Sequence, residues 1–169
     1  MTVWMCSGQG AQSEGMGADL LDILEVREVF ERASEVLEID LVHLAKEGSA
    51  EEVNDTFNAQ ALTMVLTVAI GKALMAQGKK PDALIGFSLG EIPALAFAGA
   101  YDGLTGFRLA CARGASMARA GKNVNASMAA IVKLPDETVE RLCAAYDHVW
   151  PVNYNCDGQI AVSGDRDEL

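Results

Sequence analysis

The sequence predicts an α/β fold in which a parallel sheet is flanked by helices and followed by a partial ferredoxin-like subdomain. Three observations carry this prediction. In residues 1–124, short apolar stretches alternate with longer segments of helical periodicity, as in a parallel sheet with helical connections. A strand, a sharp turn and a helix follow one another within residues 82–97. From residue 125 the pattern changes to strand, helix, strand, strand, which is how a ferredoxin-like unit begins.

The first part, residues 1–124, contains most of the expected elements. In order, they are a strand at 2–6, a small-residue loop at 7–12, a helix at 19–37, a short helix starting at 49, a long buried helix from about 58 to 77, a strand at 82–86, and helices at 89–97 and 102–120. Ser49 and Glu52 form an expected capping box. We expect Asn58 to cap the long helix, Gly78 to stop it, and Asp102 to cap the last helix.

The second part, residues 125–169, forms the small subdomain in this prediction. Its expected elements are a strand at 127–133, a helix at 136–146, and strands at 149–155 and 159–163. A ferredoxin-like unit needs one more helix and one more strand. The sequence ends where that helix would begin, so we expect the chain to be a fragment. A missing C-terminal polypeptide is then an expected partner that covers part of the sheet.

Composition excludes several classes of protein. The 169 residues are 50% hydrophobic, enough for one principal core, and we expect no segment of the roughly 18 apolar residues that a membrane span needs. The N-terminus does not resemble a signal peptide, so we expect a cytoplasmic protein that binds no membrane. A net charge of −11 argues against nucleic acid as a partner. The cysteines form no C-x-x-C zinc pair and are expected to be reduced and mostly buried: Cys6, Cys111, Cys143 and Cys156.

The stretch Gly86-Phe87-Ser88-Leu89-Gly90 matches the G-x-S-x-G nucleophile elbow of α/β-hydrolase-like enzymes. In such an elbow the glycines permit a strained turn that lifts the serine oxygen clear of the sheet. The stretch also lies between a predicted strand and a predicted helix, the context that the motif requires. Ser88 could alternatively do no more than cap the following helix. We predict that Ser88 is the nucleophile of an acyl-transferring enzyme.

An acyl-transferring serine needs amide donors for the oxyanion of its tetrahedral intermediate. Leu89 follows the nucleophile and supplies the first expected amide. The loop Gly8-Gln9-Gly10 follows the first strand and is the candidate for the second, because its small residues leave the amides accessible. Taken alone, such a stretch is more often a simple turn.

Together these motifs resemble the N-terminal portion of malonyl-CoA:acyl carrier protein transacylases, the ACP S-malonyltransferases. The resemblance rests on Gln9 within G-Q-G-A-Q, on the elbow extended to Glu91, on Arg113-Gly114 with Met117, and on residues 152–164 of the small subdomain. The motifs follow the order and spacing of that family, and the resemblance extends over the whole chain.

The resemblance implies a role for each matching position. Ser88 would be acylated by malonyl-CoA, the amides of Gln9 and Leu89 would form the oxyanion hole, and Arg113 would hold the malonyl carboxylate. A guanidinium fits this last role because it pairs with a carboxylate through two parallel hydrogen bonds; without the family, a surface arginine would be the simpler reading. The implied reaction is ping-pong transfer from coenzyme A to the phosphopantetheine thiol of holo-acyl carrier protein in fatty acid biosynthesis, with no metal or other cofactor.

Two departures from the family stand out. Phe87 occupies the position before the nucleophile, where the family often has histidine, and we expect a changed pocket shape there. The family's general-base histidine belongs to a later segment that the sequence does not contain. The two histidines present, His43 and His148, are expected to be structural or surface residues. We therefore expect the chain to be catalytically incomplete on its own.

Several alternatives remain open at this stage. Within the same chemistry, the chain could derive from a polyketide acyltransferase or from the malonyl-transfer subunit of a malonate decarboxylase. A serine hydrolase or thioesterase would use the same elbow with water as the acceptor. A non-catalytic module that binds acyl groups or carrier protein would need no general base.

Overall fold

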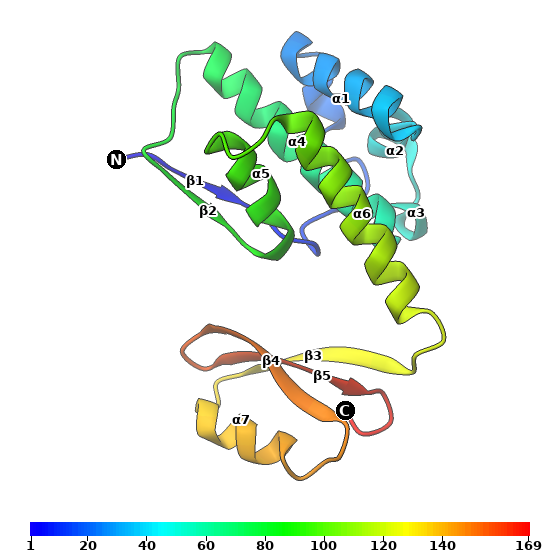
Figure 1. Cartoon of the computed structure of the whole chain (residues 1–169), viewed down its shortest axis with the longest axis vertical. Helices are drawn as coiled ribbons and strands as arrows, with labels where there is room; N and C mark the ends of the chain where they lie inside the picture. Colours follow the sequence, from blue (N-terminus) through cyan, green and yellow to red (C-terminus); the bar gives the residue numbers. More distant parts are fainter. The chain divides into compact units, whose positions relative to one another are not determined.

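Two separate hydrophobic cores organise the chain. The computed structural model describes all 169 residues, which divide into unit 1, Met1–Arg119, and unit 2, Ala120–Leu169 (Figure 1). The boundary expected from the sequence, between residues 124 and 125, falls in the connection between the last helix of unit 1 and the first strand of unit 2.

Unit 1 contains a parallel pair of strands accompanied by helices, which confirms the predicted class. Its elements are β1 (Val3–Cys6), a 3-10 turn (Ala18–Leu20), α1 (Leu24–Leu37), α2 (Leu41–Glu47), α3 (Ala50–Asn54), α4 (Thr56–Ala76), β2 (Ala83–Gly86), a 3-10 turn (Ser88–Gly90), α5 (Glu91–Phe97) and α6 (Gly103–Gly121). Strands β1 and β2 pair in parallel, with Val3 opposite Ala83 and Cys6 opposite Gly86. The carboxyl ends of both strands therefore lie at the same edge, where ligands bind in open parallel sheets.

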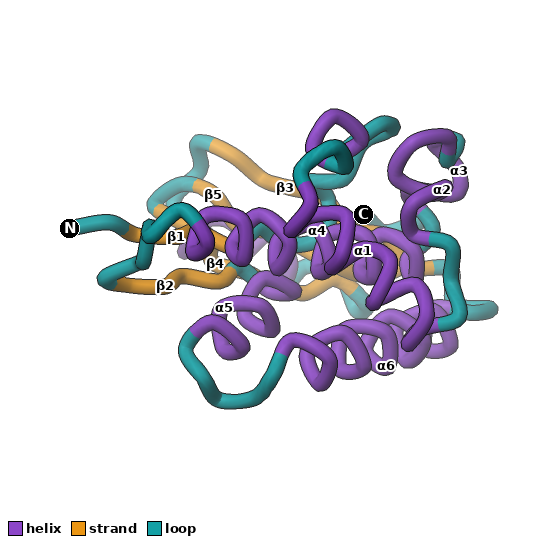
Figure 2. Tube along the Cα trace, turned by 90° about the horizontal axis from the view of Figure 1, so that it is seen from above, coloured by secondary structure: helices purple, strands orange, loops and turns teal.

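Helix α4 forms the centre of unit 1 because it is apolar on nearly every side. Its Leu62, Met64 and Val65 are fully buried in the same core as Phe30 of α1, and the two helices lie along each other (Figure 2). The expectation that no segment has the length and composition of a membrane span was wrong for this helix. However, 67% of its most apolar stretch is buried inside the unit, as in the core helix of a globular protein.

The helix ends of unit 1 follow the sequence signals with two corrections. Ser49 and Glu52 form the expected capping box, and Asp102 Oδ1 accepts a hydrogen bond from Thr105 N. Asn58 does not cap α4: Asp55 does, because its Oδ1 accepts hydrogen bonds from the amides at the helix start, 2.9 Å from Phe57 N. Helix α1 begins at Leu24 and not at residue 19, because a 3-10 turn occupies residues 18–20.

Unit 2 has the expected order of strand, helix, strand, strand. Its elements are β3 (Ala126–Val132), α7 (Asp136–Cys143), β4 (Val149–Cys156) and β5 (Gln159–Asp165), and the antiparallel strands lie in the order β3-β5-β4. One face of this sheet packs its Ile160 and Val162 against Val139 of α7. Helix α7 ends at Cys143, three residues before the expected end.

All four cysteines are free thiols with different degrees of burial. Cys6 and Cys143 are buried, Cys111 is partly buried, and Cys156 is exposed. Burial raises the pKa of the Cys111 thiol to about 11. The expectation of burial is therefore wrong for Cys156, which ends strand β4 at the turn into β5.

Candidate active site

Ser88 lies on a sharp turn between strand β2 and helix α5, as the elbow motif requires. Its φ angle is +52°, in the left-handed region that residues other than glycine rarely adopt. The side chain is exposed, whereas Leu89 beside it is fully buried in the core of unit 1. Backbone strain of this kind persists only where the surrounding structure enforces it, and it is concentrated at functional sites.

The two glycines of the motif are needed because the backbone crowds them. A Cβ atom on Gly86 would collide with the backbone of Gly90 and Glu91, and one on Gly90 would collide with the carbonyl oxygen of Cys6. The close approach of Gly90 to Cys6 seats the elbow against the end of β1. The turn therefore places Ser88 at the carboxyl ends of both parallel strands.

Arg113 of helix α6 reaches Ser88 directly. Its Nη2 donates a hydrogen bond to Ser88 Oγ over 3.0 Å, although the two residues are 25 positions apart. Its Nη1 donates to Oε1 of Gln60 over 2.8 Å. The guanidinium is thus held between a neutral amide and the elbow, with no carboxylate paired to it.

Gln60 is the residue of this cluster that the sequence did not reveal. It lies in the first turns of α4 and is fully buried. Its Nε2 donates to Gln9 Oε1 over 3.3 Å and to Met117 Sδ over 3.2 Å. Gln60 therefore joins Gln9 of the loop after β1 to Arg113 of α6. One signal could have indicated it, because a long polar side chain inside an apolar helix needs a polar partner.

The structure brings together three of the four predicted site residues through side-chain hydrogen bonds, and Leu89 is the neighbour of Ser88 in sequence. The predicted role of Gln9 and Leu89 depends on their backbone amides. Neither amide donates a hydrogen bond to another group of the chain. Both are thus available to an oxygen atom that is not part of the protein.

No side chain that could act as a general base is hydrogen-bonded to Ser88. Arg113 alone hydrogen-bonds Ser88 Oγ, and a guanidinium carries only donors. His43 lies exposed on α2, with Nδ1 3.7 Å from Glu47. In unit 2, Nδ1 of His148 donates a hydrogen bond to the Glu168 carboxylate, which raises the pKa of that imidazole above its ordinary 6.5. No group of three or more His, Cys, Asp or Glu side chains lies close enough to bind a metal ion.

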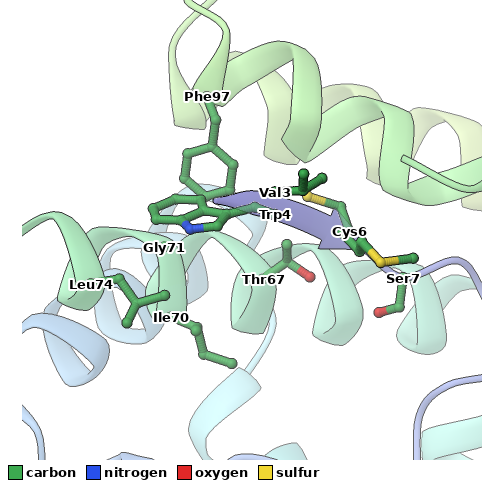
Figure 3. A pocket seen from close by; sticks show the side chains of 10 residues that line it. Val3, Trp4, Cys6, Ser7, Thr67, Ile70, Gly71, Leu74 and Phe97 are labelled. Atoms are coloured by element: carbon green, nitrogen blue, oxygen red, sulfur yellow. The ribbon is translucent and has the colours of Figure 1, made fainter. Parts of the chain in front are cut away.

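A cavity of about 340 Å³ lies beside strand β1 (Figure 3). Side chains of β1, α4 and α5 line it, among them Thr67, Ile70 and Leu74 of α4. Trp4 and Phe97 meet edge to face at its border, with ring centroids 5.3 Å apart. Its lining includes none of the four predicted site residues, so the cavity is not the candidate active site.

Residues 3–169 match the model of the acyl transferase domain family. The chain belongs to this family. Malonyl CoA-acyl carrier protein transacylase of Escherichia coli (strain K12) is 38% identical over 167 residues, which cover 96% of the chain and 54% of that relative. A polyketide biosynthesis malonyl CoA-acyl carrier protein transacylase of Bacillus subtilis (strain 168) is 35% identical over 173 residues, 100% of the chain and 58% of that relative.

Solved acyl transferases have the same fold as this chain. A malonyl-transacylase in complex with a type II PKS acyl-carrier protein superposes with a TM-score of 0.92 at 35% identity, over 99% of the chain and 56% of that structure. An acyl carrier protein S-malonyltransferase from Vibrio cholerae gives a TM-score of 0.90 at 37% identity, with the same coverage. The chain spans about half the length of these acyl transferases.

Proposed function

We propose that the gene product containing this chain transfers a malonyl group from coenzyme A to the phosphopantetheine thiol of acyl carrier protein, with Ser88 as the nucleophile. The observation that carries the proposal is the hydrogen bond between Arg113 and Ser88, at 3.0 Å. It places a cation without a carboxylate partner beside the oxygen that would carry the acyl group.

This arrangement suits a malonyl group better than an uncharged acyl group. In a malonyl ester of Ser88, a single methylene separates the ester carbonyl from the free carboxylate. That carboxylate stays within a few ångströms of Oγ and so within reach of the Arg113 guanidinium. A planar guanidinium binds a carboxylate through two parallel hydrogen bonds, which an acetyl group cannot form.

The proposed reaction has two matching halves. Ser88 Oγ attacks the thioester carbonyl of malonyl-CoA, and the amides of Gln9 and Leu89 stabilise the oxyanion. The C–S bond breaks, the proton of Ser88 passes through a general base to the departing thiolate to give the free thiol of coenzyme A, and a malonyl ester remains on Ser88. The thiol of the carrier then gives its proton to the base and attacks this ester, the bond between the acyl carbon and Ser88 Oγ breaks, and the base returns the proton to Ser88 Oγ.

The general base is the part of the mechanism for which no histidine or carboxylate is hydrogen-bonded to Ser88 Oγ. The resemblance to malonyl transacylases assigns the base to a histidine in the later part of the family's length. We propose that this segment completes the site, so that the chain alone transfers malonyl groups slowly. A positioned base contributes roughly 10²- to 10⁴-fold to such a step.

The proposal names substrates and partners but no metal or redox cofactor. Ester and thioester exchange needs no redox cofactor because no electron is gained or lost, and the backbone amides of the proposed oxyanion hole stabilise the charge that a metal would otherwise stabilise. Relatives named for malonyl CoA and acyl carrier protein, and a neighbour solved with an acyl-carrier protein, support these substrates. Relatives of similar identity include a polyketide biosynthesis enzyme, so the proposal covers fatty acid and polyketide carriers alike. A cytoplasmic location is also part of the proposal.

The test compares acyl transfer with hydrolysis in the full gene product. The protein is incubated with malonyl-CoA, holo-acyl carrier protein is added, and malonyl carrier and free malonate are measured by mass spectrometry. We expect malonyl carrier as the main product. Free malonate as the main product would identify a hydrolase, and the absence of any covalent malonyl-protein would indicate a binding module. Both results would overturn the proposal.

A further inference from the structure

We infer that Gln60 is the positioning residue that keeps Arg113 available for the malonyl carboxylate. The inference rests on the proposed function, because it assigns a partner to the arginine of the same site. Gln60 belongs to none of the motifs by which the chain resembles its family. Its assignment comes from the hydrogen bonds of its buried amide.

The orientation of the Gln60 amide follows from its partners. A guanidinium can only donate, so the atom 2.8 Å from Arg113 Nη1 must be the amide oxygen, Oε1. The amide nitrogen then faces the other way, where it donates to Gln9 Oε1 and Met117 Sδ. Both hydrogens of the amide are thus used, and a fully buried side chain is fixed in one orientation.

A neutral partner leaves the charge of Arg113 unpaired. Gln60 holds Nη1 with a dipole, and Nη2 remains directed at Ser88. A carboxylate in the same place would neutralise the guanidinium and repel the malonyl carboxylate. An apolar side chain there would leave Nη1 without its acceptor and free the guanidinium to turn away from Ser88. A glutamine is therefore suited to fix the cation without neutralising it.

Gln60 also connects the two halves of the site. It donates to the side chain of Gln9, whose backbone amide is a proposed oxyanion donor, and it accepts from Arg113, the proposed carboxylate-binding residue. The side chains form one chain of hydrogen bonds from Gln9 through Gln60 and Arg113 to Ser88. The loop after β1 and helix α6 are thereby held in register by one side chain of α4.

The experiment compares malonyl-CoA with acetyl-CoA in variants of the full gene product. Gln60→Glu keeps the shape and the acceptor for Arg113 but adds a negative charge, so we expect the ratio of kcat/KM for malonyl-CoA to that for acetyl-CoA to fall about 10- to 100-fold. Gln60→Met keeps the volume but removes the acceptor, and the same ratio should fall in the same direction. Gln77→Glu makes the same charge change at the exposed C-terminal end of α4 and should leave the ratio unchanged.

The ratio distinguishes positioning from a purely structural role. If Gln60 had only a structural role, its replacement would lower the melting temperature and reduce kcat/KM equally for malonyl-CoA and acetyl-CoA. An unchanged ratio in a folded Gln60→Glu or Gln60→Met variant, or failure of both variants to fold, would overturn the inference. If the unaltered protein forms no malonyl ester at all, the proposed function fails instead. If the unaltered protein forms the malonyl ester and prefers malonyl-CoA to acetyl-CoA, and the Gln60 variants keep that preference, only the proposed role of Gln60 fails.

Discussion

Arg113 donates a hydrogen bond from Nη2 to Ser88 Oγ over 3.0 Å, which joins helix α6 to the strained elbow after strand β2. Arg113, which is proposed to bind the substrate carboxylate, therefore contacts Ser88 Oγ, the atom that is proposed to carry the acyl group. The residue proposed to select the substrate thus lies beside the proposed nucleophile. A change at Arg113 should therefore alter which acyl group Ser88 accepts.

Replacement of Arg113 by alanine should penalise malonyl-CoA far more than acetyl-CoA. Loss of the cation that pairs with a carboxylate should lower kcat/KM for malonyl-CoA by roughly a hundredfold, because two charge-assisted hydrogen bonds to the substrate are lost. Arg119→Ala is the matched control, since Arg119 lies on the same helix and bonds only Ser116 nearby. Steady-state kinetics with both thioesters measures the effect, and equal losses for the two would remove Arg113 from the carboxylate role.

Gly90→Ala should destabilise the protein and disable the elbow. The added Cβ would collide with the carbonyl oxygen of Cys6, and relief of that collision must shift either the turn or strand β1. Crowding of this kind costs about 1–3 kcal/mol of unfolding free energy. Gly121→Ala at the end of α6 is the control, because its Cβ would meet no atom within 4 Å. Chemical denaturation of both variants tests this, and equal stabilities would contradict the crowded elbow.

Asp55→Ala should weaken the start of helix α4. Asp55 Oδ1 accepts hydrogen bonds from Phe57 N and Asn58 N, and loss of such an N-cap costs about 1 kcal/mol. Asn58→Ala is the informative comparison, because its side chain binds Glu52 O and caps nothing on α4. Urea unfolding should give the larger loss for Asp55→Ala, and the reverse order would restore Asn58 as the cap.

The pair of His148 and Glu168 should make the stability of unit 2 depend on pH. Glu168 raises the pKa of His148 above 6.5, so the stabilisation is complete below that value and is lost as pH rises through the raised pKa. His148 lowers the pKa of Glu168 below 4.5, so that contribution is lost as pH falls through the lowered value. The pair therefore stabilises unit 2 at pH values between the lowered pKa of Glu168 and the raised pKa of His148.

Glu168→Gln should abolish the alkaline part of this dependence. In an NMR titration of the imidazole protons, the midpoint of His148 should move down in the variant. The signals of His43 provide an internal reference in the same spectra, because the substitution leaves its neighbour Glu47 unchanged. A His148 midpoint unchanged by Glu168→Gln would show that the carboxylate does not hold the imidazole.

The sequence predicted the parts of the site that short motifs specify. The elbow needs a glycine two residues before and two residues after Ser88, so it can be recognised from five consecutive residues, and Leu89 follows from it. Gln9 and Arg113 came with the family resemblance, since neither a small-residue loop nor one arginine on a helix is distinctive. The element order of both units also followed from periodicity.

The rest depended on contacts between distant segments. Gln60 lies 53 residues from Arg113 and 51 from Gln9, and no local pattern indicates which polar residue of an apolar helix meets a cation. The sequence pattern indicated Asn58 as the N-cap of α4, whereas Asp55 is the cap. Both residue types favour N-caps, and only the backbone geometry distinguishes them. The early start predicted for α1 failed because helical spacing of apolar residues continues through the 3-10 turn at Ala18–Leu20.

The attachment site of the malonyl group is the most direct test of the account. The full gene product is incubated with malonyl-CoA, digested, and mapped by peptide mass spectrometry, alongside Ser88→Ala and the control Ser116→Ala, which alters an exposed serine of α6. We predict one malonyl group on Ser88 in the unaltered protein and in Ser116→Ala, and none in a folded Ser88→Ala variant. A malonyl group that persists in Ser88→Ala, or that maps to another residue, would contradict the central claim that Ser88 is the acyl-carrying nucleophile.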